Sequence, residues 1–244
     1  MAIDMKKMQS KFSNLKARSG GGSWWKPNDG VQTIRILPTE DGDPFKSFYF
    51  HYNIGKENGF LCPNNNFGDD CPVCGFVKNL YREGDEESKN MARQLNAKSR
   101  FFSPVLIRGE EGEGTRIWGY SKTVYETLLS LVLNPEYGDI TDLETGVDLD
   151  LQYGKPPGGQ FPVTKLTPRR QSSSLCKDLS DERCKELLDT IPDFSTLFER
   201  KTTDDVQKML DEHLAGDSPE GFSNETQKYT SDADKVDKAF SDLL

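Results

Sequence analysis

The chain has 244 residues, of which 34% are hydrophobic and 29% charged, and its net charge is −9. Such a composition supports one large or two small domains, and no apolar run approaches the roughly 18 to 20 residues of a membrane span, which excludes an integral helical membrane protein. The first residues lack the apolar stretch of a signal peptide, so we expect a protein that is not secreted and has no membrane contact.

A basic amphipathic helix is predicted for residues 1–18. Five Lys or Arg against one Asp give this arm a charge of +4. Apolar residues recur at helical spacing, namely Met5, Met8, Phe12 and Leu15. The glycine-rich stretch 19–23 then favours a flexible hinge, which makes the arm a separate unit. A disordered basic leader is the alternative.

Short strand-like runs bounded by Gly, Pro, Asn and Asp dominate the middle of the chain. They lie at residues 31–37, 45–52, 101–108, 115–120, 147–151 and 161–166. A helix is predicted at 123–133, and the pattern becomes helical from 175 to 214, so we place the folded core at 19–213. Short strands with few helices indicate a mainly β fold with helical additions (α+β), organised as a small barrel with insertions.

The most specific motif is H-x10-C-x8-C-x2-C, formed by His51, Cys62, Cys71 and Cys74. One imidazole and three thiolates complete a tetrahedron around zinc and leave no open position, so we expect one structural zinc ion per chain, in a subdomain at about 51–76. Three of five cysteines in one short stretch also favour a reducing compartment. Unrelated buried thiols are the alternative. Cys176 and Cys184 lack metal spacing and are expected to be free thiols.

Catalytic motifs such as G-x-S-x-G, a Walker loop or H-E-x-x-H are absent, so the chain is predicted to be a binding protein and no enzyme. Aromatic and basic residues instead alternate. The period of a strand places on one face Arg116, Trp118, Tyr120 and Lys122. A second cluster comprises Lys98, Arg100, Phe101 and Phe102. Rings that stack on bases and cations that contact phosphates predict sequence-tolerant binding of single strands, whereas core packing is the alternative for each ring.

An acidic tail is predicted for residues 214–244, with a disordered backbone. Residues 217–244 carry a net charge of −4. Four apolar residues near the end are Val236, Phe240, Leu243 and Leu244. On a flexible tether the acidic residues would compete with DNA for a basic cleft of the core, and the apolar ones would anchor a partner protein. A plain solubilising tail is the alternative.

In this order of parts the chain resembles the T4-type bacteriophage single-stranded DNA-binding proteins, also called helix-destabilising proteins. The resemblance covers nearly the whole chain and is most specific at the His/Cys motif, with weaker matches at 31–38, 98–102 and 159–161. It implies an OB-fold-like barrel core with an inserted zinc-binding subdomain. It also implies cooperative self-association on DNA through the arm, where the basic residues are Lys6, Lys7 and Lys11. The tail would recruit replication and recombination proteins, namely a polymerase, a helicase loader and a recombination mediator.

The chain departs from the family pattern after the strand that begins near Phe161. Arg169 and Arg170 stand where the family has aromatic residues, so phosphate contacts are expected there in place of stacking. The resemblance implies a protein that protects and organises single-stranded DNA during viral replication, recombination and repair, in the cytoplasm of an infected bacterial host. The alternatives are a zinc-stapled RNA-binding or transcription-regulating module, which would bind folded RNA sequence-specifically, and a zinc enzyme, which would have an open coordination position.

Overall fold

The computed structural model describes residues 24–177 and 179–216, which form two compact units. Unit 1 comprises the described chain up to Phe45, together with Phe102–Gly119 and Glu126–Pro192. Unit 2 comprises Lys46–Phe101, Tyr120–Tyr125 and the described chain from Asp193 onward. The predicted basic arm, and the predicted tail beyond Gly216, lie outside the described residues.

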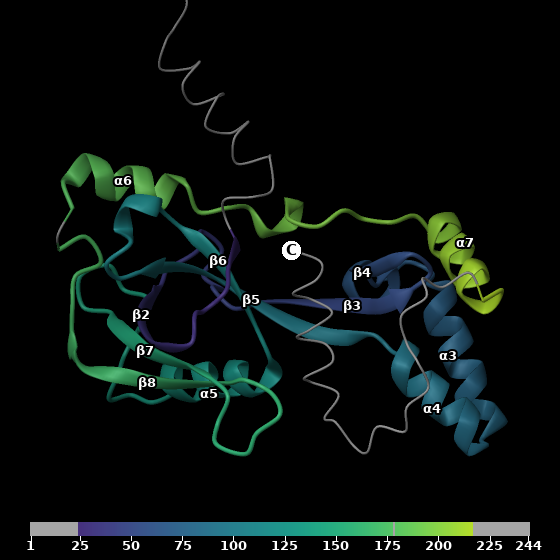
Figure 1. Cartoon of the computed structure of the whole chain (residues 1–244). Coiled ribbons are helices and arrows are strands. Elements are labelled where there is room, and N and C mark those ends of the chain that lie inside the picture. Colours follow the sequence, from purple (N-terminus) through teal and green to yellow (C-terminus); the bar gives the residue numbers. More distant parts are fainter. Residues whose placement is uncertain (1–23, 178, 217–244) are drawn as a thin grey trace, which may run out of the picture. The chain divides into compact units, whose positions relative to one another are not determined.

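Among the described residues, eight strands join in one sheet (Figure 1). They are β1 (Trp24–Trp25), β2 (Gly30–Ile36), β3 (Lys46–Ile54), β4 (Glu57–Leu61), β5 (Lys98–Ile107), β6 (Arg116–Tyr120), β7 (Val147–Gly154) and β8 (Val163–Ser172). The strand order is β1-β6-β5-β2-β7-β8, and β3 pairs with both β5 and β4. Strand β2 is antiparallel to β5 and β7, whereas β1 is parallel to β6.

The described helices are α2 (Pro63–Phe67), α3 (Pro72–Glu83), α4 (Glu86–Leu95), α5 (Lys122–Val132), α6 (Asp181–Asp189) and α7 (Thr203–Leu214), with short 3-10 turns η1 (Glu111–Glu113) and η2 (Phe194–Thr196). Four of them, α2, α4, α6 and α7, begin at residues whose side chains cap the helix. The Asp85 side chain accepts from the Ser88 amide at the start of α4, and Thr202 forms a capping box with Asp205 at the start of α7. None of the described helices is long and apolar enough to cross a bilayer.

The secondary structure agrees with most of the sequence prediction. The six predicted strand runs are confirmed as β2, β3, β5, β6, β7 and β8, and the helix at 123–133 is confirmed as α5. Three helices of unit 2, α2, α3 and α4, and the strands β1 and β4 were not predicted. The result is a mixed α/β fold built around a sheet.

Alternation along β2 and β7 builds the core of unit 1. Ile34 and Ile36 of β2, and Leu149 of β7, are at most 1% exposed, and Ile34 lies opposite Leu149 in the antiparallel register. Because successive strand residues point to opposite faces, Arg35 and Asp148 project from the other side of the same strands. That second face is therefore charged and yet buried.

A buried ion cluster occupies this second face. The Arg35 Nε atom lies 2.8 Å from Asp148 Oδ1, and Nη2 of Arg108, just after β5, lies 3.1 Å from the same oxygen. Arg35 also donates to the Ser173 carbonyl at 2.6 Å. Burial alone would raise the pKa of Asp148, but hydrogen bonds from Arg108 and Ser173 and the charges of both arginines outweigh it and hold that pKa below its ordinary value. The cluster joins β2, β5, β7 and the segment that follows β8.

Strand β8 ends the sheet order, and among the described residues only β7 pairs with it. Its side chains are mostly exposed, including Lys165, Arg169 and Arg170. Arg169 Nε lies 2.9 Å from Asp150 Oδ1 on β7. Pro168 lies opposite Leu149 and contributes no amide hydrogen to either side of the strand. The strand is thus a long, basic sheet edge.

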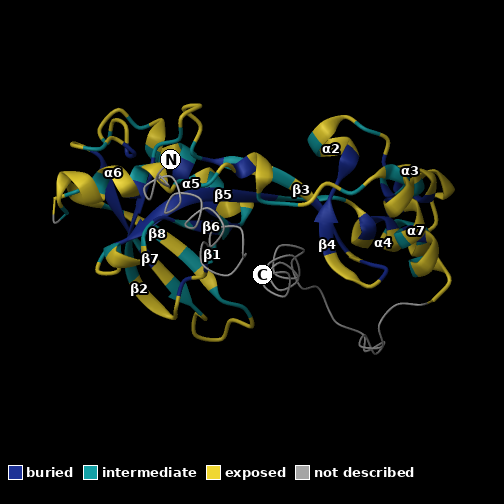
Figure 2. Cartoon of the chain, turned by 90° about the horizontal axis from the view of Figure 1, so that it is seen from above, coloured by how far each residue is buried: buried dark blue, intermediate teal, exposed yellow. Residues whose placement is uncertain are grey.

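Unit 2 has its own apolar core, made by β3, β4, α3, α4 and α7. The buried side chains that form it are Ile54, Phe60, Cys62, Cys71, Val73, Val77, Leu80, Ala92, Leu95, Val206 and Leu210. Dark blue at β4 and on the inner sides of α3 and α4 marks this core in Figure 2. Two predicted metal ligands therefore belong to a hydrophobic cluster and are not on a solvent-exposed loop.

The prediction of free thiols at Cys176 and Cys184 was wrong. The two residues form a disulfide, with Cα atoms 5.6 Å apart. Cys184 lies in the second turn of α6, and Leu187 of the same helix packs against Leu175, next to Cys176. The tertiary packing of α6 brings the sulfurs together, and sequence spacing alone contains no signal for it.

Candidate metal centre and nucleic-acid interface

The structure brings the four predicted metal ligands together in unit 2. His51 comes from β3, Cys62 follows β4, and Cys71 and Cys74 begin α3. Their ligand atoms all lie within 4.8 Å of one another. The Cys62 and Cys74 sulfurs are 3.5 Å apart, and His51 Nε2 lies 3.5 Å from the Cys71 sulfur and 3.6 Å from that of Cys74.

Local sequence explains why these side chains converge. In the β3–β4 hairpin, His51 lies opposite Phe60, so the chain leaves β4 beside the imidazole and places Cys62 there. Each of Cys62 and Cys71 is followed by a proline that starts a helix, because proline at the first helical position needs no amide partner. One turn of α3 then separates Cys71 from Cys74, which puts both sulfurs on one side of the helix start.

A hydrogen bond to the backbone fixes the orientation of His51. Its Nδ1 lies 2.8 Å from the carbonyl oxygen of Leu95, at the end of α4. Since a carbonyl only accepts, Nδ1 carries the proton and Nε2 presents its lone pair to the sulfurs of Cys71 and Cys74. Metal-ligating histidines commonly have such a partner, which selects the tautomer and the ring orientation.

Close packing of the sulfurs shifts the pKa values of the Cys62 and Cys74 thiols in opposite directions. Hydrogen bonds from Cys71 and Cys74, and from the backbone amide of Asn65 at 3.4 Å, lower the pKa of the Cys62 thiol to about 3. Hydrogen bonding to Cys62 and Cys71, with burial, raises the pKa of the Cys74 thiol. Three thiolates side by side would repel one another, and a divalent cation removes that repulsion.

The donor set fits one closed metal site. Three sulfurs and one imidazole nitrogen are the ligands of structural zinc sites of the Cys3His class, and His51, Cys62 and Cys71 are each at most 2% exposed. Four protein ligands fill a tetrahedron, so no position is left for water or a substrate. The site can therefore stabilise the loop between Cys62 and Cys71. It cannot catalyse zinc-dependent hydrolysis of a substrate without losing a ligand.

The predicted stacking rings are buried in this structure. Phe102 and Trp118 of unit 1 are at most 1% exposed, and Trp118 packs edge-on against Trp25. In unit 2, Phe101 stacks on Tyr125 with ring centres 4.0 Å apart, and Tyr120 is also buried. Stacking of these rings on bases stays a prediction, and it requires them to become accessible.

The predicted cations differ in their surroundings. Arg100 is buried, Lys98 is half-buried, and Lys122, Arg169 and Arg170 are exposed. Arg169 and Arg170 therefore offer guanidinium groups to solvent from the edge strand β8.

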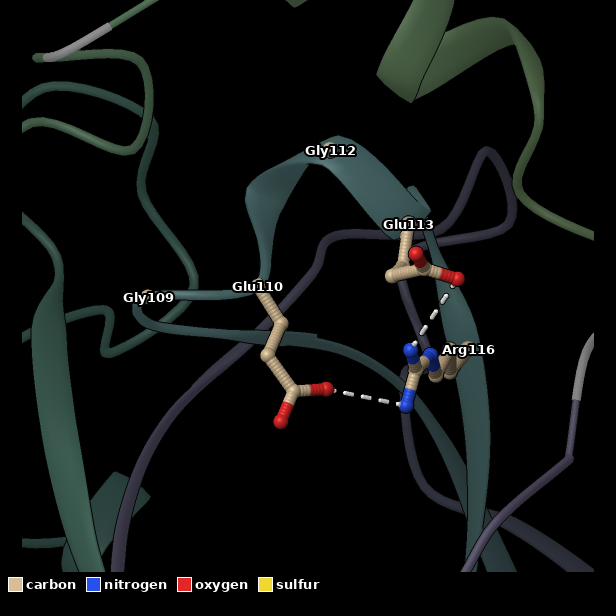
Figure 3. Close-up of a pocket in the computed structure, with 5 residues that line it drawn as sticks. All are labelled: Gly109, Glu110, Gly112, Glu113 and Arg116. Carbon is tan, nitrogen blue, oxygen red and sulfur yellow. Dashed lines mark ion pairs between the residues drawn. The ribbon is translucent and has the colours of Figure 1, made fainter.

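Arg116 is placed between two carboxylates in a shallow depression of unit 1, shown in Figure 3. Its Nη1 lies 3.1 Å from Glu110 Oε2, and its Nη2 lies 3.5 Å from Glu113 Oε2. Two negative charges against one positive charge make this depression repel phosphate. A phosphate contact by Arg116 therefore requires both ion pairs to break.

An exposed cation–π contact in unit 2 was not predicted from the sequence. The Arg200 guanidinium lies 4.4 Å from the centre of the Phe67 ring, and Phe67 is 41% exposed. Phe67 ends α2, between the ligands Cys62 and Cys71. No local signal predicts this contact, because Arg200 is far along the chain and reaches the loop only in the folded unit.

Comparison with known families gives one finding. The family model described as "gp32 DNA binding protein like" matches residues 28–214, which include the four metal ligands and every element from β2 to α7. No curated protein matches the chain.

Proposed function

Because the chain belongs to the gp32-like family of DNA-binding proteins, we propose that it binds single-stranded DNA cooperatively and largely without sequence specificity. The bound protein would protect and organise the strand during viral replication, recombination and repair, in the cytoplasm of an infected bacterial host. The observation that carries this proposal is the family match, which extends over 28–214 and so covers both units and the metal ligands.

We further propose one structural zinc ion per chain at His51, Cys62, Cys71 and Cys74. Binding of the metal would stabilise the folded loop between Cys62 and Cys71. Protein ligands would fill all four coordination positions of the metal. The convergence of the four ligand atoms within 4.8 Å supports this role.

The proposed DNA contacts combine cations with rings. Phosphates would be met by basic side chains of both units, and bases by rings that become accessible when DNA is bound. The two groups of residues are Lys98, Arg100, Arg116, Lys122, Arg169 and Arg170, and Phe101, Phe102, Trp118 and Tyr120. Since the whole chain carries a charge of −9, affinity must come from a local basic surface, for which the exposed arginines of β8 are the best placed.

The remaining features of the proposal follow the family resemblance. The core would be an OB-fold with an inserted zinc subdomain, and the basic arm would dock on the neighbouring protein along the strand. The tail would bind a polymerase, a helicase loader and a recombination mediator through its terminal apolar residues.

The direct test is fluorescence quenching of the full chain by unlabelled homopolymer single strands, with duplex DNA and a folded RNA as controls. All three tryptophans, Trp24, Trp25 and Trp118, lie in unit 1 and report on it. Similar quenching by several homopolymers and little by duplex is the expected result. Tight binding to the folded RNA alone would overturn the proposal in favour of an RNA-binding module.

Arg169→Ala is expected to weaken binding to all single strands alike and to reduce the slope of log affinity against log salt by about 0.7, the value for one lost phosphate contact on a single strand. Arg183→Ala in α6 is the matched control, because Arg183 is similarly exposed, 47% against 51%, and also pairs with one carboxylate. Titrations at four salt concentrations measure both slopes. If the two variants have the same slope of log affinity against log salt, β8 does not contact DNA.

Removal of residues 217–244 is expected to raise DNA affinity at low salt, because the net charge of −4 on the tail would no longer compete with phosphate. The gain should shrink as salt screens the attraction. Binding isotherms of the intact and shortened chains at low and high salt measure it. Equal affinities at low salt would show that the tail does not compete.

A further inference from the structure

The last helix of the described chain packs onto the metal-ligand region. Val206 and Leu210 of α7 are at most 4% exposed and belong to the same apolar cluster as Cys62 and Cys71. Figure 1 shows α7 beside α3, the helix that follows its N-cap Cys71. A Cβ atom on Gly55, in the β3–β4 turn, would lie 3.2 Å from the Met209 carbonyl, so the turn and the helix are in close approach.

Polar contacts from Arg200, just before α7, and from Thr203, the first residue of α7, hold the loop that joins two metal ligands. Arg200 forms an ion pair with Asp69 and lies over the Phe67 ring. The Thr203 hydroxyl donates to the Asp70 carbonyl at 3.0 Å. Asp69 and Asp70 directly precede Cys71, so these contacts fix the backbone at the point where the loop enters the metal site.

We infer that Arg200 and Thr203 are positioning residues for the metal centre, and that α7 docks fully only when Cys62 and Cys71 are held by the metal. Neither residue touches a ligand atom: Arg200 acts through the Asp69 carboxylate and the Phe67 ring, and Thr203 through the backbone carbonyl of Asp70. The coupling must be reciprocal, because whatever docking of α7 adds to metal affinity, metal binding adds to the docking of α7. This inference rests on the proposed zinc site.

If Arg200 and Thr203 had a purely structural role, the experiments below would give a different result. The Arg200–Asp69 pair is exposed on both sides, 56% and 40%, and exposed ion pairs add little to the free energy of unfolding. Partners outside the ligand set, in contrast, commonly change metal affinity by about 10- to 100-fold. Metal retention, and not global stability, is therefore the readout that separates the two roles.

The first experiment measures transfer of zinc from the full chain to a chromophoric chelator. Arg200→Ala and Thr203→Val are each expected to release zinc about tenfold faster than the unaltered chain, with little change in thermal unfolding. Arg200→Lys, which keeps the charge but not the planar group over Phe67, should be intermediate. Lys208→Ala, an exposed change on α7, and Arg183→Ala, in unit 1, are the controls and should release zinc at the original rate.

Zinc release at the original rate from both variants would overturn the inference while leaving the zinc site intact. Absence of zinc from the unaltered chain would instead overturn the proposed metal site itself, so the two failures are distinguishable.

Hydrogen exchange of the full chain before and after chelation tests the reverse direction. Amides of Thr203–Leu214 should lose protection when the metal is removed, while those of α6 in unit 1 keep theirs. Unchanged protection of α7 together with lost protection of β3 and β4 would contradict the coupling.

Discussion

Cys71→Ser is expected to abolish metal retention and to unfold most of unit 2. Structural zinc in small domains contributes on the order of 10 kcal/mol of apparent binding free energy, and that energy belongs to the folded state alone. Cys71 begins α3 and lies in the apolar cluster, so its loss removes a ligand and also disturbs the packing of α3 and α7. Elemental analysis should find no zinc, and the circular dichroism signal of the helices in unit 2 should fall.

The control for this experiment is Cys176→Ser, which removes a cysteine of unit 1 that is bonded to Cys184 and is no part of the cluster. It should retain one zinc ion per chain. Tryptophan fluorescence gives a second control, since it follows unit 1 and should change far less in Cys71→Ser. A Cys71→Ser chain with a full complement of zinc would show that the cluster is not the binding site.

Asp148→Ala is expected to lower the free energy of unfolding of unit 1 by about 3–5 kcal/mol, the range for removing one partner of a buried ion pair. The change would leave Arg35, which has no exposed surface, with an uncompensated charge beside Arg108. Urea unfolding at neutral pH, followed by tryptophan fluorescence, measures the effect. Asp150→Ala is the control, because Asp150 lies on the same strand but its pair with Arg169 is partly exposed, 35% and 51%, in contrast to the buried Asp148.

The same cluster gives unit 1 a defined acid sensitivity. The pKa of Asp148 is held below its unfolded value, so its contribution to stability is present above about pH 4 and is lost as the pH falls further. The stability difference between the original chain and Asp148→Ala should therefore narrow in acid. A difference that stays constant down to pH 2 would show that the carboxylate charge is unimportant.

The metal ligands could be predicted from sequence because their chemistry is local and their residue types are rare. Cys71 and Cys74 are one helical turn apart, and His51 is one of only two histidines in the chain. The contribution of α7 could not be predicted in this way. Thr203 meets Asp70 across 133 residues, and the apolar spacing of α7 shows that the helix packs but not what it packs against.

The strands could be predicted from composition, but the side that each strand buries could not. Alternation on β6 places Ile117 and Trp118 on opposite faces, and both are at most 1% exposed. A strand covered on both sides has the same alternation of residue types as one that presents rings to a ligand. Arg35 and Asp148 were hidden for a related reason, since charged residues in a strand ordinarily indicate its solvent face.

The basic edge strand β8 has a consequence for solubility. An unpaired strand edge can add a strand from another copy, and repeated addition leads to aggregates. In β8, Pro168 has no amide hydrogen to offer, and Lys165, Arg169 and Arg170 would repel the same residues of a second copy. If many copies lie side by side on DNA, as the proposed function requires, this edge would let them pack closely without joining their sheets.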